Sequence, residues 1–245
     1  VGRKDDGEAA ASKAWTAALA LWDDGKLVVA GGAGAGGDAV ERAGREAALR
    51  VAVARARFGL AERAYETTLA VEFPEGLDFR PRKERESLAR FLSWKSEREA
   101  AIVRALELYR AVLKVPGAGE WAIAATARAG QLYQGLADAL ITAEVPRPPG
   151  DVGITEVQGF VDGYCDKLGE QTPPIDALAK AELGTCLEEA GRRSTFGNWS
   201  MLCEAELSRL DPRAFPPAVE LRVEPRFQTT TSAYTDVIKT ISIRP

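Results

Sequence analysis

The chain has 245 residues, and 46% of them are hydrophobic, which is enough apolar material to bury the core of one large domain or two. Its net charge of -4 gives no general attraction to polyanions, so we expect no nucleic-acid partner. The chain has no histidine and a single methionine. Because histidine is the commonest general base and metal ligand, we expect no enzymatic activity, no metal, no cofactor and no small-molecule substrate.

The sequence shows no segment that could span a membrane or direct secretion. No stretch approaches the ~18 consecutive apolar residues of a spanning helix, and the start lacks the basic and apolar regions of a signal peptide. Since the chain begins at Val1 rather than at methionine, we expect a processed or excised piece of a longer protein.

The first predicted helix covers residues 8–22 and ends at Gly25. It places Trp15 and Trp22 on one face. Two tryptophans so placed could stack a ligand inside a ligand-carrying helical bundle. We favour the alternative, an aromatic seam that packs on the next helix.

A glycine-rich loop follows, from Gly31 to Gly37. Gly32, Gly34 and Gly37 have the G-x-G-x-x-G spacing with which a dinucleotide-binding loop approaches a pyrophosphate. That fingerprint requires a second strand about twenty residues later, where this sequence instead predicts a long helix. We therefore favour a linker and keep nucleotide binding as the alternative.

Two long helices are predicted at residues 38–72 and 83–113, since apolar side chains recur there at helical spacing. Pro74 and Pro116 end the two runs.

The longest uninterrupted helical pattern covers residues 120–145. Its apolar side chains form two stripes on different sides, so the helix needs to be covered twice. Ala125, Ala129 and Gly130 are small enough to allow a neighbour to approach closely. We therefore expect this helix in the interior of a stack of helical hairpins.

A family resemblance is carried by four runs: ARFGLAERAYETTLAVEFP, ALELYRAVLKVP, EWAIAATARAGQLYQGLADAL and FGNWSMLCEAELSRLDPRAFPP. Over residues 54–220 the chain resembles tetratricopeptide-type proteins of myxobacteria and related bacteria. These are periplasmic or outer-membrane-associated scaffolds, and they include components of the adventurous gliding-motility machinery. The resemblance implies a right-handed α-solenoid, a location in the cell envelope, and other envelope-complex proteins as partners.

The repeat pattern itself is degenerate. Two helices resemble the second helix of a tetratricopeptide repeat, in which an aromatic residue follows a small one by four positions and a proline comes shortly after. The instances are Ala61, Tyr65 and Pro74, and Ala105, Tyr109 and Pro116; the two alanines lie 44 positions apart (105 minus 61) rather than the usual 34. A closed helical bundle would give a similar periodicity, so it remains the alternative to the stack.

The last third of the chain changes in character. Prolines between residues 146 and 149 predict an extended connector, followed by helices at 155–168, 175–191 and 198–210. The Thr-rich, β-branched residues 219–245 predict an extended tail or a strand. We therefore divide the chain into an N-terminal helix and linker (1–37), a helical domain (38–217) and a C-terminal tail (218–245).

No group of side chains predicts catalysis. The acidic pairs Asp23 with Asp24 and Glu188 with Glu189 are neighbours in sequence and point in different directions, as solvated charges do. The basic run at residues 80–86 is interrupted by acids, and the serine and cysteine candidates lack a histidine to activate them.

The positions of the three cysteines bear on a possible disulfide and on the compartment in which the protein is found. Cys186 and Cys203 lie on the apolar stripes of two consecutive helices, equally far from the turn between them, so they should face each other in an antiparallel hairpin. Cys165 is then the odd thiol. A Cys186–Cys203 disulfide would fit an oxidising periplasm, whereas three free thiols would fit a reducing cytoplasm; the envelope resemblance favours the disulfide.

Overall fold

The chain forms an all-α structure in the part that can be described. The structure is a computed structural model that describes residues 2–26, 39–147 and 153–216, and these residues form no β-strand beyond one isolated bridge between Asp78 and Arg147. The helices are α1 (Gly2–Asp23), α2 (Ala39–Leu69), α3 (Glu84–Leu113), α4 (Glu120–Ile141), α5 (Ile154–Gly169), α6 (Thr172–Arg193) and α7 (Asn198–Leu210). The prediction of an all-α fold is therefore confirmed, whereas the right-handed TPR-like solenoid stays a prediction. The glycine-rich loop and the predicted C-terminal tail lie outside the described residues.

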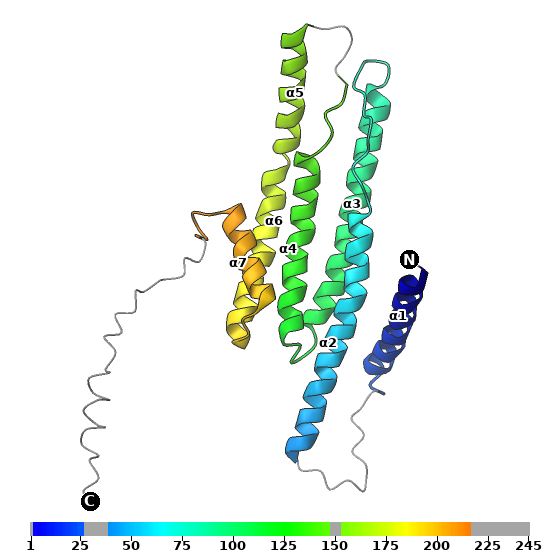
Figure 1. Cartoon of the computed structure of the whole chain (residues 1–245), viewed down its shortest axis with the longest axis vertical. Helices are drawn as coiled ribbons and strands as arrows, with labels where there is room; N and C mark the ends of the chain where they lie inside the picture. The colour runs from blue at the N-terminus through cyan, green and yellow to red at the C-terminus, as the bar shows by residue number, and fades with distance from the viewer. Residues whose placement is uncertain (1, 27–38, 148–152, 217–245) are drawn as a thin grey trace, which may run out of the picture.

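The helices lie side by side in an elongated array that largely follows chain order (Figure 1). Helix α2 packs on α3, α3 on α4, α4 on α6 and α6 on α7, and each of these pairs is antiparallel. Helix α1 packs on α2 at one edge, and α7 covers α6 and α4 at the other. Helix α5 runs nearly in line with α6, so it extends the array beyond the end of α4 (Figure 1).

Helix α4 occupies the centre of this array. It contacts α2 and α3 on one side and α6 and α7 on the other, so both of its apolar stripes are covered as the pattern predicts. Leu132, Leu136 and Leu140 are buried against the first core, whereas Ile123 and Ala127 are buried against α6 and α7. The close approach of α6 depends on Gly130, because a Cβ atom added there would lie 2.6 Å from Cγ of Leu183.

Aromatic rings fill the space between α2, α3 and the start of α4. Phe58 lies at their centre, with ring centroids 5.8 Å from Tyr109 and 5.3 Å from Trp121. On the other side of α2, the indole of Trp15 lies where a side chain at position 59 would be, so Gly59 lets α1 approach closely. The predicted aromatic seam is thus present, with Trp15 and Trp22 packed against the main core.

Several helix ends differ from the sequence prediction. Helix α6 begins at Thr172 rather than at residue 175, because Pro173 and Pro174 occupy its first turn, where the missing backbone N–H costs nothing. Helix α4 ends at Ile141 rather than at residue 145, and a non-helical segment leads from Thr142 to Pro146. The prolines at 173 and 174 therefore begin a helix that they were expected to precede.

Candidate functional site

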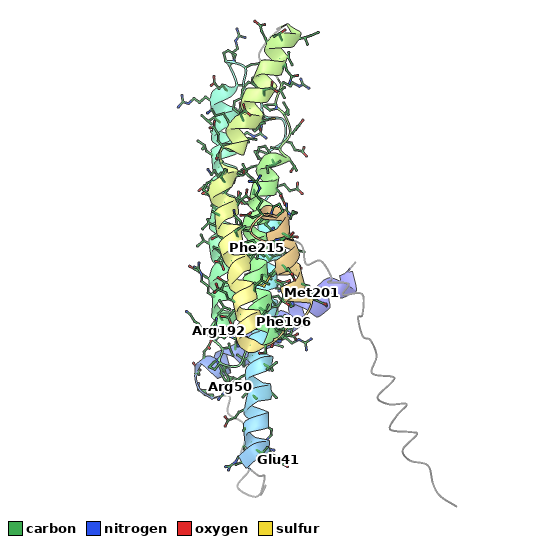
Figure 2. The ribbon with its side chains drawn as sticks, turned by 90° about the vertical axis from the view of Figure 1, so that its left-hand side faces the viewer. Glu41, Arg50, Arg192, Phe196, Met201 and Phe215 are labelled. Carbon is green, nitrogen blue, oxygen red and sulfur yellow. A yellow bond between two sulfur atoms is a disulfide. The ribbon has the colours of Figure 1, made fainter. Side chains whose placement is uncertain are left out.

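The most exposed apolar surface around the last helical hairpin lies along α7. Phe196 is 76% exposed, Met201 66% and Phe215 36%; we call these three residues the α7 patch. Figure 2 labels Phe196 near the start of α7, Met201 beside the helix and Phe215 near its other end. The three residues are spaced along the length of α7 rather than gathered at one point, and exposed apolar side chains along one helix can contribute to a protein-interaction surface.

The α7 patch arises because α7 has a narrow buried face. Cys203 and Leu207 face α4 and α6, and with them the helix buries one stripe. Met201 lies off that stripe and is left in solvent. Phe196 follows a turn in which Ser194 adopts a left-handed backbone with φ 49°, and Phe215 lies just beyond the end of the helix.

Cys186 and Cys203 hold this hairpin together. Both side chains are fully buried, their Cα atoms are 6.4 Å apart and their sulfur atoms lie at disulfide distance, 2.07 Å. The two residues face each other as their equal distance from the turn predicts. Cys165 on α5 is exposed and has no disulfide partner.

A polar cluster beneath the α7 patch joins α7 to the opposite side of the array. The guanidinium of Arg128 on α4 lies over the rings of Trp199, at 5.1 Å, and Tyr65, at 4.8 Å. It also pairs with Glu62 at 2.9 Å. Tyr109 donates its hydroxyl to the same carboxylate, and burial together with that hydrogen bond raises the pKa of Tyr109. The contact with Arg128 therefore holds the Trp199 side chain in place. This contact stabilises the position of α7, which carries the patch.

Charged residues surround the patch in mixed sign. Arg192 and Arg193 pair with Glu189, and Arg209 pairs with Glu206, which also accepts a hydrogen bond of 2.7 Å from Gln134. The expectation that Glu189 is a solvated charge is wrong, because its carboxylate is buried and holds two arginines at the end of α6. The residues beside the patch are thus polar and of mixed charge, with three arginines and two glutamates in ion pairs.

Ion pairs also involve Asp23, Asp24 and part of the basic run at residues 80–86. Asp23 pairs with Arg57 of α2, and Asp24 with Lys26. In the basic run, Arg80 donates to both carboxylate oxygens of Asp78 at 2.9 and 3.0 Å. A polar cavity of about 310 Å³ lies beside this pair, where the start of α3 meets residues 144–147.

A ligand between Trp15 and Trp22 would need a cavity that both side chains line. A space of about 390 Å³ lies between α1 and α2, lined by Trp15, Leu19, Leu49, Val53 and neighbouring residues. Trp15 lines this space, whereas Trp22 does not. The loop from Gly31 to Gly37 lies outside the described residues.

Within the described ranges, no group of three or more histidine, cysteine, aspartate or glutamate side chains could hold a metal ion. The same ranges contain no helix long and apolar enough to cross a membrane. No protein-family model matches the chain, and no curated protein and no solved structure matches it.

Sequence reasoning did not identify the α7 patch. Phe196 and Met201 are single apolar residues outside the helical stripe, and such residues are common on any surface. The available signal was the stripe itself: once Trp199, Cys203 and Leu207 are assigned to the core, Met201 necessarily points to solvent.

Proposed function

We propose that this chain is a non-enzymatic, TPR-like scaffold that binds other proteins of a bacterial cell-envelope complex. The family resemblance of residues 54–220 supports the repeat type and suggests the gliding-motility apparatus as the setting. The observation that carries the proposal is the α7 patch, an exposed apolar surface on the terminal helix of the array. The terminal helix of a solenoid normally presents a polar outer face, so exposed apolar residues on and beside α7 favour a role in binding.

The construction of the hairpin supports an interaction role. Trp199 is fixed by Arg128 and by an edge contact with Phe58 at 5.8 Å, so α7 is already ordered before a partner arrives. A surface that is ordered in advance loses less conformational entropy on binding. The patch therefore combines apolar contact area with a rigid support.

The cysteine pair supports a location in the periplasm or at the outer membrane. Disulfides persist in the bacterial periplasm and are rare in a reducing cytoplasm. The sulfurs of Cys186 and Cys203 lie at bonding distance inside a buried cluster. The cytoplasm remains the alternative location, and the thiol content of the native protein distinguishes the two.

The proposal is tested by affinity capture from the envelope fraction of the cells that make the protein, with partners quantified by mass spectrometry. The double variant Phe196→Ser/Met201→Ser should lose at least tenfold in recovery of its partners. The matched control is Val103→Ser/Leu108→Ser, which changes two exposed apolar residues of α3 and should capture as the wild type does. Equal recovery by all three proteins would contradict a role for the patch.

A second measurement addresses the nucleotide alternative. We expect NAD, FAD and ATP to leave the melting temperature of the full chain unchanged. A saturable rise with any of them would instead favour a nucleotide-binding protein.

A further inference from the structure

A groove lies at the opposite end of the array from the α6–α7 turn, between the start of α3 and α5. It arises because α4 has 22 residues and α3 has 30, so α4 stops about 12 Å short of the length of α3. Helix α5 continues past the end of α4, so α3 and α5 face each other there without a helix between them (Figure 1). The space has a volume of about 500 Å³.

The lining of this groove is largely aromatic. Phe79, Phe91, Phe160 and Tyr164 supply rings from three segments of the chain, with Leu88 and Leu168 beside them. The Phe79 and Tyr164 rings are 6.1 Å apart. At one end the groove is bounded by Gln171, which accepts a hydrogen bond of 2.8 Å from Lys95.

The rim of the groove carries no surplus charge. Glu84 and Lys167 bring one charge of each sign, and Lys167 pairs with Glu170 at 2.8 Å. A charged ligand would gain little there, and it would lose its hydration among the rings. The groove is therefore suited to a neutral molecule.

Tyr164, which lines the groove, carries a hydroxyl group that lacks a partner among the described residues. The hydroxyl oxygen of Tyr164 is buried and makes no hydrogen bond with any described residue. Burial also raises the pKa of Tyr164 to about 12, so the group stays a hydroxyl that can donate or accept. The oxygen is sealed from solvent, so a ligand reaches it only when the Tyr164 side chain turns towards the groove. Because a buried hydroxyl without a partner costs free energy, that turn is favoured by a ligand that can hydrogen-bond to it.

Two glycines of α5 keep the groove open. Gly159 and Gly163 line it one helical turn apart, and a Cβ atom added at either position would meet nothing within 4 Å. Glycine weakens a helix interior by about 1 kcal/mol relative to alanine. At these two positions the absence of a side chain leaves space along the wall of the groove.

From this geometry we infer that the groove between α3 and α5 binds a small, neutral, largely aromatic or apolar molecule that hydrogen-bonds to Tyr164. A volume of about 500 Å³ falls within the ~300–1,000 Å³ of pockets that hold small ligands. A partner helix of ten residues, about 15 Å long and 10–12 Å wide, needs more than ~1,000 Å³. The inference does not depend on the scaffold function, since this site is far from α7.

The test uses N-phenyl-1-naphthylamine, a neutral aromatic probe with one N–H group whose fluorescence rises in apolar surroundings. The full chain should bind it saturably at one site. Gly163→Leu should fill the groove and weaken binding at least tenfold without lowering the melting temperature. Gly184→Leu is the matched control, because Gly184 lies on α6, also has open space around its Cβ position and does not line the groove.

A third variant tests the hydrogen bond. Tyr164→Phe should weaken probe binding several-fold and leave the melting temperature equal or higher, because it removes an unpaired buried hydroxyl. Undiminished binding to Gly163→Leu, or no saturable binding to the wild-type chain, would overturn the inference. A wild-type dimer that Gly163→Leu converts to a monomer would also overturn it, since a second copy would then occupy the groove.

Discussion

Arg98 is a buried cation that has no carboxylate partner among the described residues. Its side chain is 4% exposed, and it donates to the carbonyl oxygens of Thr68 and Val71 at the end of α2. Burial lowers the pKa of Arg98, and the carbonyl end of the α2 dipole offsets this cost. Arg98 thereby adds a charged donor to two carbonyl groups that also accept hydrogen bonds from the backbone N–H of Val71 and the indole of Trp94.

We therefore expect Arg98→Met to destabilise the protein by about 2–3 kcal/mol, because two buried carbonyl groups lose a charged donor. Arg104→Met, an exposed change on the same helix, should stay within about 0.5 kcal/mol of wild type. Urea denaturation measures both. Equal stabilities of the two variants would show that Arg98 does not support the end of α2.

The titration of Asp78, which lies just before α3, tests the ion pair between Asp78 and Arg80. Its hydrogen bonds from Arg80 lower the pKa of Asp78 from 3.8 to about 2. Since the folded-state pKa lies below the unfolded value, the contribution of Asp78 to stability is complete above pH 3.8 and is lost as the pH falls towards 2. In an NMR titration, Arg80→Gln should raise the pKa of Asp78 towards 3.8, whereas Arg82→Gln should leave it unchanged. An unshifted value in wild type would contradict the pairing.

At the scale of the helix, α4 contains two glycines with different surroundings. At Gly130, an added Cβ would meet Leu183 at 2.6 and 2.8 Å; at Gly135 the nearest atom would be 3.6 Å away, which is ordinary contact. Gly130→Ala should therefore cost about 1–3 kcal/mol through overpacking against α6. Gly135→Ala should be neutral or should gain up to about 1 kcal/mol from helix propensity. If both changes stabilise the protein, α6 does not pack tightly on α4.

The α6–α7 hairpin makes a prediction about thiols. Cys186 and Cys203 are 17 positions apart, and a bridge that closes a loop of this size stabilises a protein by about 3 kcal/mol. Titration of the denatured, unreduced protein should find one free thiol, that of Cys165. Three free thiols would remove both the disulfide and its support for a periplasmic location.

Periodicity predicted the helices better than it predicted their ends. Residues 120–145 could be assigned to the centre because both of their apolar stripes must be buried against other helices. Helix α7 matches its predicted bounds because its single apolar stripe and the turn before it mark where the helix lies. The start of α6 was missed, since a proline both ends one helix and suits the first turn of the next. Only the three-dimensional arrangement shows that Thr172 continues almost directly from α5.

The candidate sites could be predicted only in part. The facing cysteines follow from counting residues on either side of one turn. The α3–α5 groove depends on the different lengths of α3 and α4 and on rings from Phe79 to Tyr164, which no local pattern connects. The α7 patch likewise depends on the fact that no described helix covers the outer side of α7. An apolar stripe in the sequence indicates which residues are buried, but not which side of the helix stays uncovered.

Across the whole molecule, the array has one central helix and two terminal helices, α1 and α7, each covered on one side in the described structure (Figure 1). The main apolar surface at the α7 end comprises Phe196, Met201 and Phe215, and it is supported by the cysteine pair and by Arg128. We therefore propose that partners bind at α7.

The most direct test places a photo-crosslinking amino acid at position 201 in living cells, with position 103 on α3 as the control. Both wild-type side chains are more than half exposed, so either position tolerates the probe. We predict a discrete protein adduct in the envelope fraction from position 201, no such adduct from position 103, and its loss when Phe196→Ser and Phe215→Ser are added. The absence of an adduct at position 201, or the same adduct from both positions, would contradict the assignment of partner binding to α7.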